Sequence, residues 1–407
     1  MNVIFIEPGF PANQREFARG LAAAGATVIG IGERSMDELD GELKSWMLHY
    51  HQVGNVTDVG QLVGAVRWVQ GQLWVDRLES TIEAHQMAAA QAREICSIPG
   101  TSVHTTYLCR DKPSMKEALR QVGVPTAQST AASSAAEVHA FAAQVGFPLI
   151  LKPRAAAGAA GTVRVDNDVE LNHALGELGG SGTDSIAVEE FVEGHEAFYD
   201  TLCVNGEAVY DFVSHYYPNV LDAMRQRWIS PQFICTNRID VAPDYAEVRE
   251  MGRRVISALG IGTSATHMEW FFGPKGLRFS EIGCRPPGVR AWDLYAVGND
   301  IDIYREWANT IIHGQVEQPL SRRQSAGIVA IRPDRDGNIS HYEGVDEVQH
   351  RFAGHIIDAH LPPPGTPTQP VEAGYMANAW IRLAHPDYDT LRAMLNAVGE
   401  TVRVRAS

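Results

Sequence analysis

The sequence predicts a mixed α/β protein with more than one domain. The chain has 407 residues, which at roughly 150 residues per domain indicates two to three domains. Apolar residues make up 45% and charged residues 20% of the chain, so it is too apolar to be disordered. Its N-terminal part runs strand, helix, strand within about 30 residues, which is typical of a parallel α/β unit.

The apolar runs and their breakers predict the elements in order. Residues 3–6 and 27–31 are expected to be buried strands, and residues 12–24 between them a helix that stops at Gly25. Helical periodicity over residues 79–95 precedes a domain boundary near residues 100–110. The further predicted elements are strands at 147–152, 163–165, 186–192 and 197–204, a loop of small residues at 154–161, helices at 112–122, 246–259 and 388–398, and short strands after about residue 320.

Residues 215–238 carry aromatic side chains and arginines without a clean period. We expect them to form a long functional loop or lid that contributes to a substrate wall. A plain surface loop is the alternative.

The charge balance restricts the partners. The chain has 49 acidic and 34 basic residues and a formal charge of -15, which argues against nucleic acid or an anionic membrane as a partner. A small anionic ligand in a local basic pocket remains compatible with it.

The location expected from the sequence is the cytoplasm. The N-terminus lacks a basic segment followed by a long apolar run, and nowhere do 18 apolar residues follow one another, so neither a signal peptide nor a membrane span is predicted. The five cysteines are widely spaced and form no CxxC pair, so we expect reduced thiols rather than disulfides or a zinc site.

Two aromatic-rich runs flank the sequence Gly-Pro-Lys-Gly, which predicts a β-hairpin. A three-residue loop, 274–276, would pair Gly273 with Leu277 and, counting outward, Glu269 with Glu281. Directly opposed carboxylates repel each other unless a cation lies between them. Because Mg²⁺ prefers one or two carboxylates together with substrate phosphates, the pair predicts a magnesium site. A solvent-exposed acidic strand face and a general acid/base pair are the alternatives.

Three further stretches carry chemistry. Arg285 follows the second acid closely, where a guanidinium could hold a phosphate or an oxyanion, or else form a surface ion pair. Lys152 ends an apolar strand before a run of Ala and Gly that could cover phosphates or be a flexible connection. The strand over residues 186–192 leads into a Gly-containing turn that could contact a flat base, with Glu196 on sugar hydroxyls. An edge strand with solvated glutamates is the alternative.

In this order and at these separations, the motifs resemble the ATP-grasp superfamily, in particular its carboxylate–amine ligases of the L-amino acid ligase and D-alanine–D-alanine ligase kind, over roughly residues 1–320. The resemblance implies an ATP-grasp fold with α+β lobes behind an N-terminal parallel sheet. It implies a reaction in which ATP converts a carboxylate to an acyl phosphate, which an amine then attacks to give an amide, ADP and phosphate. The implied domains are 1–105 (N-terminal), 106–195 (small ATP-grasp lobe), 196–320 (large lobe with the hairpin) and 321–407 (a β-rich segment on the large lobe).

The resemblance also implies a role for each residue that matches the family's motifs. The implied catalytic residues are Arg285 and Lys152; the nucleotide-binding residues are Lys112, Lys152, Gly158, Gly161, Glu189, Glu190, Phe191, Val192 and Glu196; the metal ligands are Glu269 and Glu281; and the substrate-contacting residues are Glu83, His267, Arg285 and Gly288. Glu83 would meet an α-amino group. His267 would line the acceptor side, with a purely structural histidine as the alternative.

The implied cofactors are ATP and Mg²⁺, for which Mn²⁺ could substitute. The family commonly has an asparagine two residues after the second acid, where this chain has Gly283, so the number of metal ions stays open. The expected partners are small-molecule substrates, with a homodimer as one possible assembly. A carboxylase-like or purine-pathway ATP-grasp enzyme and an ATP-binding protein without turnover are the alternatives. A dinucleotide site at residues 30–35 is disfavoured because the third glycine is missing.

Overall fold

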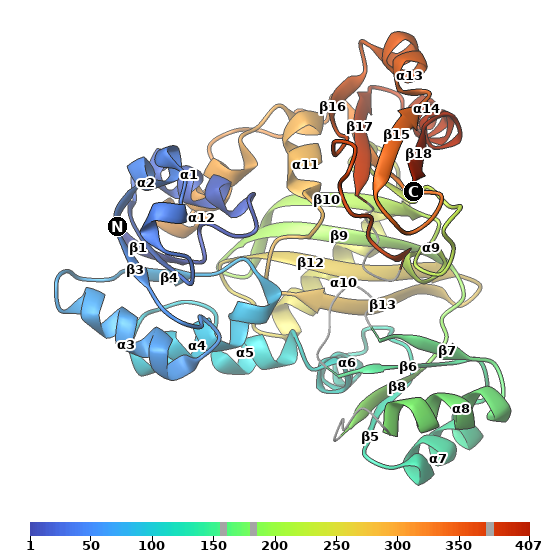
Figure 1. The fold of residues 1–407 in the computed structure, drawn as a ribbon. Coiled ribbons are helices and arrows are strands. Elements are labelled where there is room, and N and C mark those ends of the chain that lie inside the picture. Colours follow the sequence, from blue (N-terminus) through green and yellow to red (C-terminus); the bar gives the residue numbers. More distant parts are fainter. Residues whose placement is uncertain (155–160, 180–184, 372–377) are drawn as a thin grey trace.

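The computed structural model describes residues 1–154, 161–179, 185–371 and 378–407 (Figure 1). It contains a parallel N-terminal sheet, a small antiparallel sheet, and a long antiparallel sheet that continues into the C-terminal part of the chain. Among the helices of the described residues, none combines the length and apolar character that a membrane span requires.

The N-terminal sheet has the strand order β3-β2-β1-β4, and its strands all pair in parallel. The strands are β1 (Asn2–Ile6), β2 (Thr27–Gly32), β3 (Met47–Gln52) and β4 (Arg77–Glu79), and the helices are α1 (Gln14–Ala23), α2 (Gly41–Trp46), α3 (Val59–Gln70) and α4 (Gln86–Ile95). The predicted parallel unit is therefore confirmed. The single helix predicted over residues 79–95 is wrong at its start, because Glu79 is the last residue of strand β4 and α4 begins only at Gln86.

The small sheet has the order β5-β8-β6-β7 and is antiparallel. Its strands are β5 (Ser129–Ala132), β6 (Leu149–Pro153), β7 (Val163–Val165) and β8 (Ile186–Glu190). The helices α7 (Ala135–Val145) and α8 (Asp168–Gly179) pack apolar side chains against it. The helices α5 (Val103–Leu108) and α6 (Lys112–Gln121) connect the N-terminal sheet to this lobe (Figure 1).

The long sheet has the order β13-β12-β9-β10-β11-β14-β17-β16, and every neighbouring pair is antiparallel. Its strands are β9 (His195–Val204), β10 (Glu207–Tyr217), β11 (Gln232–Cys235), β12 (Ser264–Gly273), β13 (Gly276–Gly283), β14 (Ser325–Ile331), β16 (Ile356–His360) and β17 (Ala379–His385). Its helices are α9 (Val220–Ala223), α10 (Tyr245–Ala258), α11 (Ala291–Asn299), α12 (Ile303–His313), α13 (Val345–Phe352) and α14 (Tyr388–Thr401); β15 (Ile339–Glu343) and β18 (Arg403–Ala406) pair separately.

The two faces of the long sheet have different neighbours, and this alternation positions the site. On β9, Phe198 and Leu202 pack with α11, α12 and the N-terminal helix α1, whereas Tyr199 and Cys203 pack with α6 and α10. Side chains that share the face of Phe198 therefore point toward the N-terminal part of the molecule.

The loop or lid predicted over residues 215–238 is wrong. Strand β10 continues through Tyr217, and β11 follows after the short helix α9. Phe233 and Ile234 in β11 are fully buried and pair with β14, a strand about 90 residues further along the chain. Only the segment between α9 and β11 is a surface connection, where Trp228 is 82% exposed.

Candidate active site

The hairpin of β12 and β13 places two carboxylates opposite each other. Glu269 pairs directly with Glu281, as predicted, so both side chains lie on one face of the sheet. The predicted loop is wrong in detail, because Gly273 pairs with Gly276 rather than with Leu277, which leaves a two-residue loop. A bulge between Glu269 and Trp270 then shifts the register by one residue and restores the pairing of the two acids.

Lys112 reaches the second of these acids. It is the first residue of α6, where the Asp111 side chain accepts a hydrogen bond from the backbone N–H of Ser114 and caps the helix. Its Nζ lies 3.1 Å from Oε2 of Glu281. Burial alone would raise the pKa of Glu281, but Lys112 and Lys152 lower it below its ordinary value. The acid therefore stays ionised at neutral pH.

A buried cluster of two lysines and one glutamate lies beside this pair. Oε2 of Glu189 is 2.6 Å from Nζ of Lys116 and 2.9 Å from Nζ of Lys152. The two ammonium groups lower the pKa of Glu189 to about 2 against the opposing effect of burial, and burial lowers the pKa of Lys116 to about 8. Sequence reasoning missed Lys116, although it follows Lys112 by four residues and so shares its helix face.

The other residues with an implied nucleotide role lie along the same lobe. Glu190 accepts a hydrogen bond from Gln128 at 2.9 Å, and the ring of Phe191 lies 4.2 Å from the guanidinium carbon of Arg164. Val192 follows them and is half-buried. The adenine-facing role of residues 189–192, which depends on backbone and apolar contacts, stays a prediction.

The loop predicted to cover the phosphates lies mostly outside the described residues. Gly158 falls there, so nothing is said of its structure. Gly161 is described and has a φ of 68°, in the left-handed region that favours glycine.

Glu196 is buried close to the metal-site acids. Its Oε2 accepts a hydrogen bond from the backbone N–H of Val220 at 2.7 Å. Burial and the neighbouring Glu269 raise the pKa of Glu196 to about 8. Its implied contact with ribose stays a prediction.

His267 shares the sheet face of Glu269. Its Nδ1 lies 2.7 Å from Oδ1 of the buried Asp200, whose other oxygen accepts a hydrogen bond from the hydroxyl of Tyr295, and its Nε2 lies 3.6 Å from Oε1 of Glu269. Burial alone would lower the pKa of His267, but Asp200 raises it to about 9. The imidazole is therefore a cation at neutral pH, held beside an acid of the candidate metal site.

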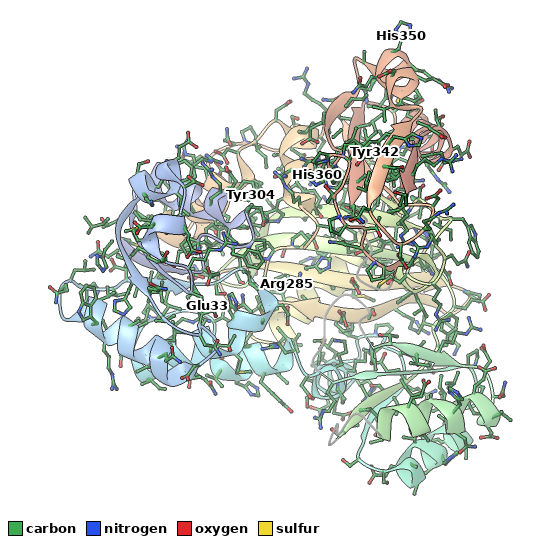
Figure 2. All side chains as sticks on the ribbon, in the orientation of Figure 1. Glu33, Arg285, Tyr304, Tyr342, His350 and His360 are labelled. Atoms are coloured by element: carbon green, nitrogen blue, oxygen red, sulfur yellow. The ribbon has the colours of Figure 1, made fainter. Side chains whose placement is uncertain are left out.

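Arg285 follows the end of β13, and Figure 2 shows it between the long sheet and the N-terminal part of the molecule. Its Nε donates to Oε2 of Glu83 at 2.8 Å, and the other oxygen of Glu83 lies 3.3 Å from Nε of Arg110. The Arg285 side chain is only 15% exposed, which excludes the surface ion pair considered as its alternative. Gly288 lies in the exposed loop that follows.

The surroundings of Gly283 favour a residue without a side chain. A Cβ atom there would lie 3.3 Å from Cγ of Arg285 and 3.4 Å from Oε2 of Glu83. The contact with Glu83 is an ordinary van der Waals distance, whereas Cγ of Arg285 would have to move by a few tenths of an ångström. A side chain at position 283 would therefore lie directly against the Glu83–Arg285 ion pair. The departure from the family's asparagine thus coincides with an ion pair between two parts of the molecule.

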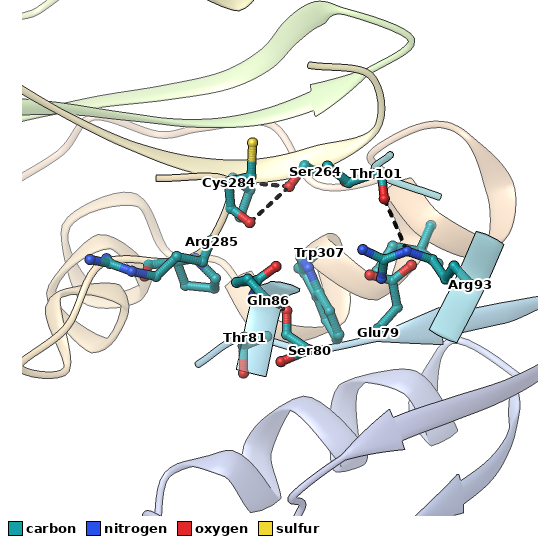
Figure 3. Close-up of a pocket in the computed structure, with 13 residues that line it drawn as sticks. Glu79, Ser80, Thr81, Gln86, Arg93, Thr101, Ser264, Cys284, Arg285 and Trp307 are labelled. Atoms are coloured by element: carbon teal, nitrogen blue, oxygen red, sulfur yellow. Dashed lines mark hydrogen bonds between the residues drawn. The ribbon is translucent and has the colours of Figure 1, made fainter. Parts of the chain in front are cut away.

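A small polar cavity lies behind Arg285 (Figure 3). Its volume is about 10 Å³ and Ser80, Gln86, Cys284 and Trp307 are among its lining residues, so it could hold about one water molecule. Figure 3 shows that the guanidinium group of Arg285 points away from it. Reactants must therefore approach Arg285 from the guanidinium side.

Known proteins resemble this chain in sequence and in fold. Residues 111–199 match the family model described as carbamoyl-phosphate synthase L chain, ATP binding domain. An uncharacterized protein of Sinorhizobium fredii is 25% identical over 304 residues, 72% of this chain, and the match spans only 60% of that relative. The L-arginine-specific L-amino acid ligase of Bacillus subtilis is 25% identical over 326 residues, which are 78% of this chain and 76% of that protein.

The fold has a close counterpart among solved structures. The L-amino acid ligase from Bacillus licheniformis superposes with a TM-score of 0.78 at 17% identity, over 100% of this chain and 98% of that one. Together these comparisons confirm the predicted fold class and the resemblance to ATP-grasp ligases.

Proposed function

We propose that this chain, which has the ATP-grasp fold, is an ADP-producing ligase that joins a carboxylate to an amine. The observation that carries the proposal is the pairing of Glu269 with Glu281. Lys112 forms an ion pair with Glu281, and Arg285 is near enough to the neighbouring His267 to influence its pKa. Such a site combines ligands for a cation, cations for phosphates, and an arginine for a carboxylate. The L-amino acid ligase among its relatives supports the same reaction class.

The lysines would neutralise the nucleotide phosphates. The ammonium group of Lys112 pairs with Glu281, and that of Lys152 pairs with Glu189. Both ammonium groups would contact the triphosphate when ATP binds. Since phosphoryl transfer depends on positioning and on neutralising charge, cations held in advance by buried acids lower its barrier.

The donor set fits magnesium. Glu269 and Glu281 supply hard carboxylate oxygens, and no cluster of three or more His, Cys, Asp and Glu side chains forms a metal site in the described part of the chain. Mg²⁺ suits such a pair because it takes one or two carboxylates, substrate phosphates and water. When bound, the ion would neutralise charge on the phosphates. Use of Mn²⁺ in its place, and the number of ions, stay predictions.

The remaining residues would act on the acyl group. Arg285 would hold the substrate carboxylate while a carboxylate oxygen attacks the γ-phosphorus of ATP and ADP leaves. The amine would then attack the acyl phosphate, and Arg285 together with the His267 cation would stabilise the oxyanion before phosphate leaves. The amine loses a proton in this step.

The test is ADP release that requires both a carboxylate and an amine. The purified chain would be assayed with MgATP across a matrix of carboxylates and amines, alone and together. We expect release only with both, and at least a 100-fold loss in Glu281→Ala. Glu207→Ala, which removes an exposed acid at the start of β10, is the control and should keep wild-type activity.

Other outcomes would identify the alternatives. Turnover with bicarbonate in place of an organic acid would indicate a carboxylase-like enzyme, and turnover limited to phosphoribosyl amines a purine-pathway enzyme. Tight ATP binding with no ADP release under any combination would indicate a binding protein. The domain boundaries at residues 105, 195 and 320, a homodimer and a cytoplasmic location belong to the same proposal.

A further inference from the structure

A cluster formed by Glu83, Arg110 and Arg285 lies at the junction of the N-terminal sheet, α6 and β13. The two guanidinium groups occupy the two oxygens of the Glu83 carboxylate, with Nε–O distances of 3.3 Å for Arg110 and 2.8 Å for Arg285. Two cations and one anion leave the cluster with a net charge of +1.

Arg110 is the unsatisfied member of this cluster. Its side chain is 23% exposed, and its buried Nε makes no hydrogen bond. Within the described residues, Glu83 is the one ionic partner of its guanidinium group. A guanidinium carries five N–H donors. The Nε of Arg110 faces Glu83, and its partly exposed terminal N–H groups are available to a ligand.

The neighbouring acids are already committed. Asp111, the next residue, holds Arg154 through Nε at 2.8 Å, and Glu281 is paired with Lys112. The charge on Arg110 is therefore not balanced by them. The lysines already described supply the charge for the nucleotide phosphates, whereas Arg110 shares its acid with Arg285, the residue assigned to the reacting carboxylate.

A substrate cannot reach Arg285 from the side opposite its guanidinium group. The cavity behind Arg285 has room for only one water molecule, and Gly283 contributes no side chain next to Glu83. A bound acid would therefore lie against the two guanidinium groups.

We propose that Arg110 binds a second carboxylate of the substrate, so that the acid activated by this protein is a dicarboxylate such as an acidic amino acid. This inference rests on the proposed ligase function. Arg285 would take the carboxylate that reacts, Arg110 the one that does not, and Glu83 an α-amino group where the substrate has one. A planar guanidinium suits this role because it binds a carboxylate through two parallel hydrogen bonds.

The experiment compares acids with their isosteric amides. The full chain would be incubated with MgATP and hydroxylamine, which traps an acyl phosphate as a hydroxamate, so that each carboxylate is tested alone. The matched pairs are L-aspartate with L-asparagine and L-glutamate with L-glutamine, and succinate tests the need for the amino group. We expect at least one acid to exceed its amide by 10-fold or more in kcat/KM.

Two variants assign this preference to one side chain. Arg110→Gln should bring the acid-to-amide ratio close to 1, whereas Arg110→Lys should retain part of it. Arg253→Gln, which removes an exposed arginine on α10 that pairs only within its helix, should keep the wild-type ratio.

The outcomes separate this inference from the proposed function. Hydroxamate formed from neutral amino acids as readily as from acids would refute the role of Arg110 and leave the ligase function standing. If no carboxylate gives hydroxamate, the ligase function fails, and binding is then read from thermal unfolding. Stabilisation by aspartate, glutamate or succinate that is lost in Arg110→Gln would still support the anion site, and its absence would refute it.

Discussion

Replacing Glu189 by glutamine should destabilise the small lobe strongly. The change keeps the shape of the side chain and removes the charge that Lys116 and Lys152 share. Because the Lys116 side chain is only 1% exposed, water cannot replace the lost carboxylate as a partner of its ammonium group. The variant would therefore hold two buried like charges without their counter-ion.

The distances set the size of the effect. At an effective dielectric constant of about 20, an ion pair at 2.6 Å or at 2.9 Å is worth about 6 kcal/mol. Desolvation of three buried ions offsets most of this gain, and removing one partner of a buried pair costs about 3–5 kcal/mol in practice. We expect a loss in that range. The loss should shrink as the pH rises toward 8 and level off above it, because a Lys116 ammonium without its counter-ion loses its proton below the pKa of about 8 that it has in the native protein.

Hydrogen exchange measures this loss where it occurs. Amide protection in β6 and β8 should fall by about 100- to 4,000-fold, since each 1.4 kcal/mol corresponds to a factor of ten. MgATP should stabilise Glu189→Gln more than the wild type, because the phosphates would replace the missing anion. Glu193→Gln, an exposed neighbour, is the control, and Glu189→Gln with Lys116→Met should recover part of the loss. Unchanged protection in Glu189→Gln would refute the account of the cluster.

Three further predictions follow from single contacts. Asp200→Asn should lower the pKa of His267 from about 9 toward 6.5, as measured by NMR titration in EDTA. In the wild type, the His267–Asp200 pair stabilises the fold fully below pH 6.5, and this contribution is lost as the pH rises through 9. A free energy of unfolding in urea that stays constant from pH 6.5 to 9 would contradict this prediction. Burial lowers the pKa of His215 to about 3, so its stabilising effect is present above pH 6.5 and declines as pH falls toward 3, and His215→Gln should flatten the urea-unfolding profile in that window. Gly283→Ala should raise KM for the carboxylate several-fold, because its Cβ would lie 3.3 Å from Cγ of Arg285; an unchanged KM would show that the ion pair tolerates displacement.

The local chemistry of the hairpin could be predicted from sequence, but its register was predicted for a partly wrong reason. The predicted three-residue loop with regular pairing beyond it, and the observed two-residue loop with a bulge farther along the strands, both oppose Glu269 to Glu281. Turn residues restrict a hairpin to a few loop types, whereas a bulge depends on what the strands pack against. The bulge lies next to Trp270, which is buried against α10 in the core beneath the hairpin.

The error over residues 215–238 has a different cause. Strand β11 has only four residues, too few for a period to stand out, and it is stabilised by a partner strand about 90 residues away. Propensity within a short window carries no information about such a partner. Lys116 was missed for a related reason, because a lysine in a helix is usually solvated and its burial depends on Glu189 in another strand.

The Glu83–Arg285 pair marks where sequence reasoning reaches its limit in this chain. The two residues are 202 positions apart, and each has an ordinary surface explanation when considered alone. From the sequence alone, Gly283 is interpreted as a lost metal ligand, because it lies two residues after Glu281, where the family commonly has an asparagine. In the structure the same glycine lies against both Glu83 and Arg285, so this position borders the ion pair as well as the predicted metal site. Arg110 and Arg285 place two guanidinium groups on Glu83 beside this glycine, and these are the groups that we propose bind the carboxylate substrate. The departure from the family's pattern therefore bears more on which acid binds than on whether ATP does.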